Sequence, residues 1–161
     1  MNNLRVDLHF DVADDLTDTL LDTIPSQEQV EDWLKVTLDQ IKYSKPIELS
    51  IRSVSIEESN QLNLTYRNKD SATNVLSFPA DIPEFVESNH IGDIAICAQV
   101  LCDEAKAQNK AIENHWAHLC VHGLLHLLGY DHITEQDAAE MEAIEIATLS
   151  ALSIDDPYQV R

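Results

Sequence analysis

The sequence contains few glycines, few cysteines and few basic residues. Of its 161 residues only 3 are Gly and 3 are Cys, and Cys97, Cys102 and Cys120 all lie in apolar surroundings. An odd and small number of cysteines argues against a disulfide framework, so we expect reduced core residues of a cytoplasmic protein. Lys and Arg together number 10 against 29 Asp and Glu, which gives a formal net charge of −19. This balance opposes non-specific binding of nucleic acids, which depends on cations that neutralise phosphates.

Long apolar runs are absent as well. No stretch approaches the roughly 18 residues that a membrane-spanning helix needs. The opening segment MNNLRVDLHFDVADD has neither the apolar core nor the cleavage site of a signal peptide, so we expect no membrane segment and a cytoplasmic location. Apolar residues still make up 44% of the chain, which is enough for a single globular domain over residues 1–161.

The hydrophobic pattern predicts four strands and about five helices. Alternation and short apolar runs predict strands at residues 4–10, 47–51, 74–79 and 91–97. Apolar stripes at helical spacing predict helices at residues 26–42, 55–67, 98–110, 111–128 and 134–149. Strands and helices mixed in this order, with no repeat and no linker, predict an α+β fold in which a small mixed sheet packs against the helices.

Several local signals support these boundaries. Ser26 precedes Gln29 by three residues, as in a capping box, and Thr134 has the spacing to cap the last helix. Gly92 lies inside the fourth predicted strand, where a glycine indicates a bulge or a close approach of another backbone.

The segment HLCVHGLLHLLGYDH (118–132) contains three histidines in the pattern H-x-x-x-H-x-x-G-x-x-H. On a helix, His122 and His126 lie one turn apart on one face, so their imidazoles can share one ion. Gly129 can adopt a positive φ and end the helix, which brings His132 to the ion from another direction. Three imidazoles with an open fourth position are typical of a catalytic zinc site. We predict one zinc ion on this late helix and the turn after it, although nickel would also suit three imidazoles.

The other polar residues of this region allow more than one role. His118 lies one turn before His122 and could support a ligand, lie at the surface, face a substrate or be a ligand itself, while His115 is expected at the surface. Asp131 either fixes the tautomer of a ligand or is an exposed turn residue. Cys120 points about 200° away from His122 around the helix, so we expect it in the core and not on the metal.

Gly123 stands where zinc proteases of the metzincin type have a glutamate directly after the first histidine. In those proteases the glutamate carries a proton from the water on the metal to the leaving amine, so a glycine argues against peptidase chemistry. Phosphodiester cleavage depends more on neutralising the phosphoryl oxygens and orienting the attack. A glycine is also expected to leave room for a phosphate beside the metal, which is compatible with a phosphodiesterase.

Three segments together resemble the YbeY family of bacterial metal-dependent endoribonucleases: HGLLHLLGYDH (122–132), LNLTYRNKDSATNVLSFP (62–79) and IGDIAIC (91–97). The resemblance spans most of residues 47–146. It implies an α+β domain with a zinc ion on His122, His126 and His132, and a function in ribosomal RNA maturation and ribosome quality control. It also implies that Arg67 lies near the metal and takes part in catalysis.

The residues around Arg67 fit a phosphate contact. A guanidinium offers paired hydrogen bonds to phosphoryl oxygens and keeps its charge, and Lys69 is a weaker second candidate. The alternative for Arg67 is a salt bridge to one of the many carboxylates. Many family members have Asp where this chain has Asn74, so we assign Asn74 no catalytic role. One focused basic channel would let an acidic protein bind RNA without binding it indiscriminately.

The leading hypothesis is a zinc-dependent endoribonuclease that is specific for single-stranded rRNA. In this hypothesis the ion and Arg67 stabilise the charge that develops on the phosphate, and no residue is identified as the general base. A ribosome or ribosome-associated proteins would supply much of the targeting, and no organic cofactor is expected. Two alternatives stay open: a non-catalytic ribosome-associated factor whose zinc staples the last helices, and a metal hydrolase of another ester or of a peptide.

Overall fold

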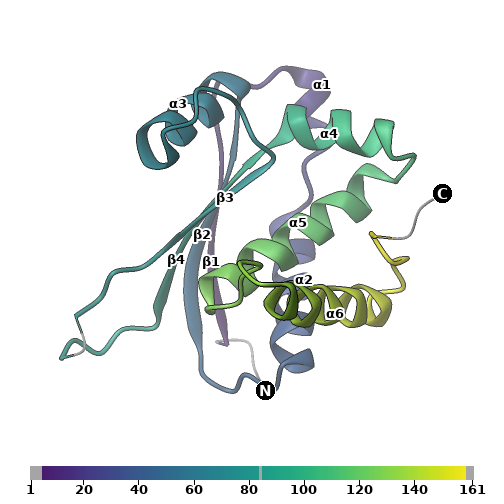
Figure 1. The fold of residues 1–161 in the computed structure, drawn as a ribbon. Helices are drawn as coiled ribbons and strands as arrows, with labels where there is room; N and C mark the ends of the chain where they lie inside the picture. Colours follow the sequence, from purple (N-terminus) through teal and green to yellow (C-terminus); the bar gives the residue numbers. More distant parts are fainter. Residues whose placement is uncertain (1–4, 84, 159–161) are drawn as a thin grey trace.

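The computed structural model describes residues 5–83 and 85–158, which contain one sheet and several packed helices (Figure 1). The strands are β1 (Val6–Val12), β2 (Ile47–Val54), β3 (Val75–Pro79) and β4 (His90–Cys97). The helices are α1 (Asp18–Leu21), α2 (Gln27–Gln40), α3 (Ile56–Arg67), α4 (Ala98–Ala107), α5 (Ile112–Leu127) and α6 (Glu135–Ala151). The predicted α+β class is therefore confirmed, with one helix more than expected. The extra helix, α1, has 4 residues and none of them is buried, so it leaves no periodic pattern in the sequence.

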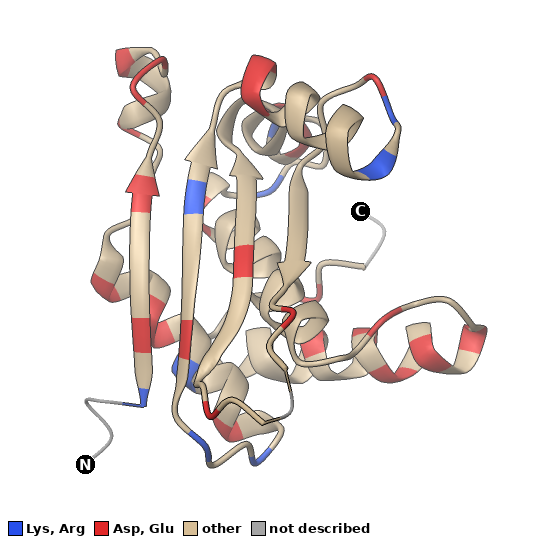
Figure 2. Ribbon diagram, turned by 90° about the vertical axis from the view of Figure 1, so that its left-hand side faces the viewer, with Lys and Arg blue, Asp and Glu red and all other residues tan. Residues whose placement is uncertain are grey.

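The sheet is mixed, in the order β1-β2-β4-β3. The pairs β1–β2 and β2–β4 are parallel, while β3 is an edge strand that runs antiparallel to β4 (Figure 2). The predicted strand that begins at Leu4 is confirmed from Val6 onward, and Leu4 itself lies outside the described residues.

Gly92 explains a local irregularity between β2 and β4. Glu48 pairs with His90 and the next residue, Leu49, pairs with Gly92, so β4 has one extra residue at this point. Gly92 has a φ of +144°, and a Cβ there would overlap the carbonyl oxygen of Phe78 on β3. The expectation of a bulge and a close backbone approach is confirmed, and only glycine fits without strain.

Most helices cover one face of the sheet. Helix α5 contacts β3 and β4 on one side and α2, α4 and α6 on the others, so it lies in the middle of this layer (Figure 1). The main core combines inward-facing strand residues with helix residues, among them Leu49, Ile51, Leu34, Leu38 and Leu124. A smaller cluster on the opposite face joins α3 to the sheet through Leu62, Leu76, Phe78 and Ala95. The metal motif thus lies on the most enclosed helix of the fold.

The two predicted helix caps are also confirmed. Ser26 and Gln29 form a complete capping box at the start of α2, and Thr134 accepts a hydrogen bond of 3.0 Å from the backbone N–H of Asp137. The three cysteines are buried and unpaired, as expected of core residues. Within the described ranges, none of the helices combines the length and the apolar character that crossing a bilayer requires.

Candidate metal centre

The turn after α5 brings three histidines together. Gly129 has a φ of +102°, and Tyr130 N–H donates to the carbonyl of Leu125 at 3.0 Å, which reverses the chain directly after the helix. The ring centroid of His132 consequently lies 5.1 Å from that of His122 and 4.8 Å from that of His126. The two helical rings are 4.6 Å apart, and their Nε2 atoms are separated by 3.1 Å.

This geometry fits a metal ion. One ligand atom from each histidine lies within 4.8 Å of the other two, and tetrahedral zinc with bonds of about 2.0–2.1 Å separates two nitrogens by roughly 3.3 Å. Burial, together with the neighbouring His122 and His132, lowers the pKa of His126, which favours the neutral imidazole that binds metals. In the described part of the chain, no fourth His, Cys, Asp or Glu joins this group. The donor set therefore fits zinc and leaves a coordination position open.

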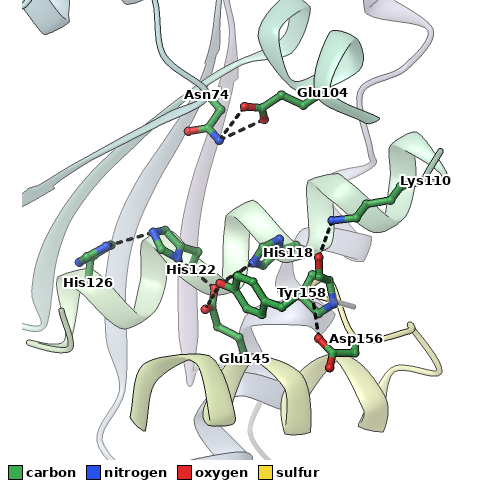
Figure 3. Close-up of polar contacts among 10 residues, drawn as sticks. Asn74, Glu104, Lys110, His118, His122, His126, Glu145, Asp156 and Tyr158 are labelled. Carbon is green, nitrogen blue, oxygen red and sulfur yellow. Dashed lines mark hydrogen bonds and ion pairs between the residues drawn. The ribbon is translucent and has the colours of Figure 1, made fainter. Parts of the chain in front are cut away.

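A buried carboxylate on α6 holds the first of these histidines in place. Glu145 is 0% exposed, and its Oε2 accepts hydrogen bonds from His122 Nδ1 at 2.9 Å and from His118 Nε2 at 3.0 Å (Figure 3). Its other oxygen accepts a hydrogen bond of 2.5 Å from the Tyr158 hydroxyl. A proton on Nδ1 of His122 leaves Nε2 with the lone pair that faces His126 and His132.

The charge of Glu145 is stabilised by the same contacts. Burial by itself would raise the pKa of this carboxyl, but the hydrogen bonds and charges of His118 and His122 outweigh it and hold the pKa at about 2. Burial and the neighbouring Glu145 carboxylate raise the pKa of Tyr158, so its hydroxyl keeps its proton and donates.

The sequence did not reveal Glu145, although a signal was present. Glu145 follows Met141 by four residues and precedes Leu149 by four, so a carboxylate lies on the apolar stripe of α6. A fully buried Glu is rare unless it is paired, so this position points to a partner. His118 and His122 contact the same oxygen of Glu145, so His118 lies where it could support His122, the predicted ligand. Asp131 instead accepts a hydrogen bond of 3.2 Å from the N–H of Ile133, as a turn residue does.

Gly123 has a structural reason that differs from the expected one. A Cβ at this position would lie 2.9 Å from Cδ1 and 3.1 Å from Cγ2 of Ile94 on β4. The glycine therefore lets α5 approach the sheet closely, and the expectation that it leaves room beside the metal is wrong, because its missing side chain would point into the core. The absence of a carboxylate directly after His122 still distinguishes this motif from that of the zinc proteases.

The three histidines open into a cleft of about 520 Å³ that also contains Arg67. The cleft is lined by residues of α3, of β3 and the residue before it, of α5 and of the turn after α5: Arg67, Asn74, Val75, Leu76, Ser77, Pro79, His122, His126, Gly129, Tyr130, Asp131 and His132. The Arg67 guanidinium donates to the carbonyl oxygens of Ser77 at 2.8 Å and Tyr66 at 3.2 Å. Across residues 5–83 and 85–158, no ion pair joins Arg67 to a carboxylate, so the salt-bridge alternative is not observed.

Comparison with known proteins identifies the family. A sequence model described as endoribonuclease YbeY matches residues 12–153. The chain belongs to the YbeY family. A curated relative named endoribonuclease YbeY, from Colwellia psychrerythraea (strain 34H / ATCC BAA-681), is 50% identical over 137 residues, which cover 84% of this chain and 88% of the relative. The family predicted from three separate motifs is thus confirmed.

A solved structure has a similar fold. The solution structure of TM1509 from Thermotoga maritima matches with a TM-score of 0.53 and 22% sequence identity. The match covers 96% of this chain and 99% of the other. At this identity the similarity concerns the fold alone, and it extends over nearly the whole chain.

Asn74 lines the cleft and also belongs to a chain of hydrogen bonds that reaches α4 and α5. Its Nδ2 donates to both carboxylate oxygens of Glu104, at 3.1 and 3.3 Å (Figure 3). Glu104 also accepts a hydrogen bond of 2.9 Å from Nε2 of His115. His115 is only 4% exposed, so the prediction that it lies at the surface is wrong. Helix α4, which carries Glu104, packs against α5 and covers this side of it, so His115 is buried although it is polar.

Proposed function

We propose that this chain is a zinc-dependent endoribonuclease that cleaves single-stranded regions of rRNA, with residues 1–161 forming one metal-dependent hydrolase domain. Membership of the YbeY family supports the nuclease class. The main support for a zinc-dependent mechanism is that Arg67 of α3 lines the same cleft as His122, His126 and His132. A three-histidine group with an open position opposite a guanidinium suits a reaction at a phosphate.

Each of these side chains has a distinct part in the proposed reaction. The three histidines would hold the zinc ion, which supplies Lewis-acid stabilisation of phosphoryl oxygens when it is bound. Arg67 would bind the phosphate, because its five N–H groups exceed the two carbonyl bonds that fix its orientation. Glu145 and His118 keep the His122 ring oriented and do not touch the substrate. Lys69, which follows the C-terminal residue of α3 by two, would add charge near the cleft.

The net charge of −19 restricts how the chain meets RNA. Its surface repels RNA except where the metal and a few cations gather, so we expect weak affinity for naked RNA and targeting by a ribosome or ribosome-associated proteins. A cytoplasmic location belongs to the same proposal. Sub-micromolar binding of short single-stranded RNA at physiological salt would contradict the expected weak affinity for naked RNA.

The two alternatives receive less support. A zinc ion that only stapled helices would be expected to have four protein ligands, whereas three histidines form the group in the described residues. A peptidase would need a proton shuttle next to His122, and position 123 is a glycine packed on Ile94. The zinc staple also gives the guanidinium in the cleft no role.

The proposal is tested by measuring bound zinc and cleavage of single-stranded rRNA fragments in three proteins. Wild type should bind one ion and cleave, Arg67→Ala should bind the ion without cleaving, and His126→Ala should lose both. Lys106→Ala is a charge-matched control, because Lys106 lies in the last turn of α4 and outside the cleft. Equal cleavage by all four preparations would identify a contaminant and remove the basis of the proposal.

A further inference from the structure

An exposed aromatic side chain lies next to Arg67. Tyr66 is 59% exposed at the end of α3, and its ring lies 5.2 Å from that of Phe78, at an interplanar angle of 64°. The Arg67 guanidinium carbon lies 5.3 Å from the centroid of the same Phe78 ring. Tyr66 and Arg67 are therefore packed on one aromatic support, which fixes both near the cleft.

These residues lie around the free edge of the sheet. Ser77 of β3 lines the cleft, and its hydroxyl donates to the carbonyl of Gly123 at 3.4 Å. Phe78, the next residue, points to the opposite face and packs with the cluster beneath α3. Because side chains alternate along a strand, Tyr66 lies across the β3 edge from the histidines. Arg67 reaches both sides of the β3 edge, since it lines the cleft on one side and covers the Phe78 ring on the other.

The charges beside the cleft differ from one side to the other. Arg67 and Lys69 lie where α3 ends and the next loop begins, and Figure 2 shows blue segments at this place. On the opposite side, the turn after α5 and the first turns of α6 share a second hollow that contains Asp131, Asp137 and Glu140. Helix α6 has no Lys or Arg. A strand of phosphates is therefore attracted toward α3 and repelled from α6.

From this arrangement we infer that Tyr66 is a stacking site for an RNA base. The RNA strand leaves the cleft over the β3 edge, Arg67 binds a phosphate there, and the base of the adjoining nucleotide stacks on the exposed Tyr66 ring. The inference rests on the proposed nuclease function and adds a nucleotide subsite to it. Stacking on an aromatic ring requires an unstacked base, and every base offers a π-face. Tyr66 would thus favour single-stranded RNA of any sequence over a duplex.

The test uses the zinc-loaded full chain and short single-stranded RNAs in which one nucleotide beside the cleavage position is 2-aminopurine, whose fluorescence falls on stacking. Tyr66→Ala should abolish the quenching and raise KM by roughly 5- to 100-fold, with kcat changed little. Tyr66→Phe should retain both properties, because the ring is kept. Leu64→Ala is the matched control, since Leu64 is 42% exposed on the same helix and should behave as wild type.

A substrate with an abasic nucleotide at the quenched position completes the test. Wild type should then bind it no better than Tyr66→Ala does, because the ring has no base to contact. If Tyr66→Ala matches wild type in KM and quenching while both cleave, the stacking inference is wrong and the nuclease proposal stands. If wild type quenches the probe without cleaving, the nuclease proposal fails and the stacking site stands. If wild type neither binds nor cleaves, both fail.

Discussion

Glu145 and His122 are joined by a hydrogen bond of 2.9 Å between Oε2 and Nδ1, although they lie on different helices. This bond links α6 to the face of α5 that carries His122 and His126. It fixes the tautomer in which His122 presents Nε2 to His126 and His132, so in the proposed zinc site the carboxylate would act on the ion through the histidine and not directly.

Replacing Glu145 should therefore weaken metal binding. Glu145→Gln puts an amide NH₂ where donors already converge, so we expect the zinc affinity to fall by about 10- to 100-fold. The affinity is measured by competition with a chromophoric chelator. Glu140→Gln removes an exposed carboxylate from the same helix and should leave the affinity unchanged. An unaltered affinity in Glu145→Gln would show that the bond to His122 does not orient the ligand.

The packing of Gly123 on Ile94 predicts a specific double-mutant result. In Gly123→Ala, the new methyl group meets a side chain that is 1% exposed. Overpacking typically costs about 1–3 kcal/mol, while replacing a helical Gly by Ala contributes about 1 kcal/mol of helix propensity. We expect a net loss of roughly 1 kcal/mol in the free energy of unfolding, measured with urea.

The compensating variant is Ile94→Val, which removes the Cδ1 atom that would lie 2.9 Å from the new methyl group. In this background Gly123→Ala should be neutral or stabilising, because the helix propensity gain remains and the closest contact is gone. Equal effects of Gly123→Ala in both backgrounds would mean that Ile94 is not what selects glycine here.

The hydrogen bond between Asn74 and Glu104 predicts that a charge change at position 74 affects stability. Asn74→Asp would place a second carboxylate against Glu104, replacing a hydrogen bond by repulsion. We expect the free energy of unfolding to fall by roughly 1–3 kcal/mol near neutral pH. Adding Glu104→Gln should restore it, because the amide can donate to the new carboxylate and still accept from His115. A double variant no more stable than Asn74→Asp would contradict this account.

His115 should make stability depend on pH. Burial lowers the pKa of His115 below its ordinary value of 6.5, despite its hydrogen bond to Glu104. As the pH falls through about 6.5, the unfolded chain gains a proton that the folded protein does not yet accept, so stability decreases. His115→Gln keeps a donor for Glu104 without titrating. The free energy of unfolding is measured for both proteins in their metal-free forms between about pH 7.5 and 5.5. Over this range His115→Gln should lose less stability than wild type. Identical losses would show that His115 does not make stability depend on pH.

Much of the fold and the metal site followed from local patterns. The strand and helix positions, the caps and the turn at Gly129 depend on spacing within one segment, and so does the convergence of His122, His126 and His132. The strand order and the burial of His115 could not be predicted in this way. They depend on how elements that are distant in the sequence pack together. The sequence of α5 alone does not tell which of its sides other elements cover.

Glu145 could be predicted in part. Its place on the apolar stripe of α6 could be seen in the sequence, but its partners are 23 and 27 residues away on another helix. The role of Gly123 was misjudged for a similar reason, because the residue that faces it, Ile94, belongs to a strand. Contacts between separate elements were the part that the sequence pattern did not specify.

The most direct test of the central claim is removal and return of the metal. The chain is stripped with a chelator, checked by circular dichroism to be folded, and assayed on single-stranded rRNA fragments during a zinc titration. We predict no cleavage by the stripped protein and full recovery at one zinc ion per chain, with no recovery in a His126→Ala control. Cleavage by the folded, zinc-free protein at the wild-type rate would contradict a zinc-dependent mechanism.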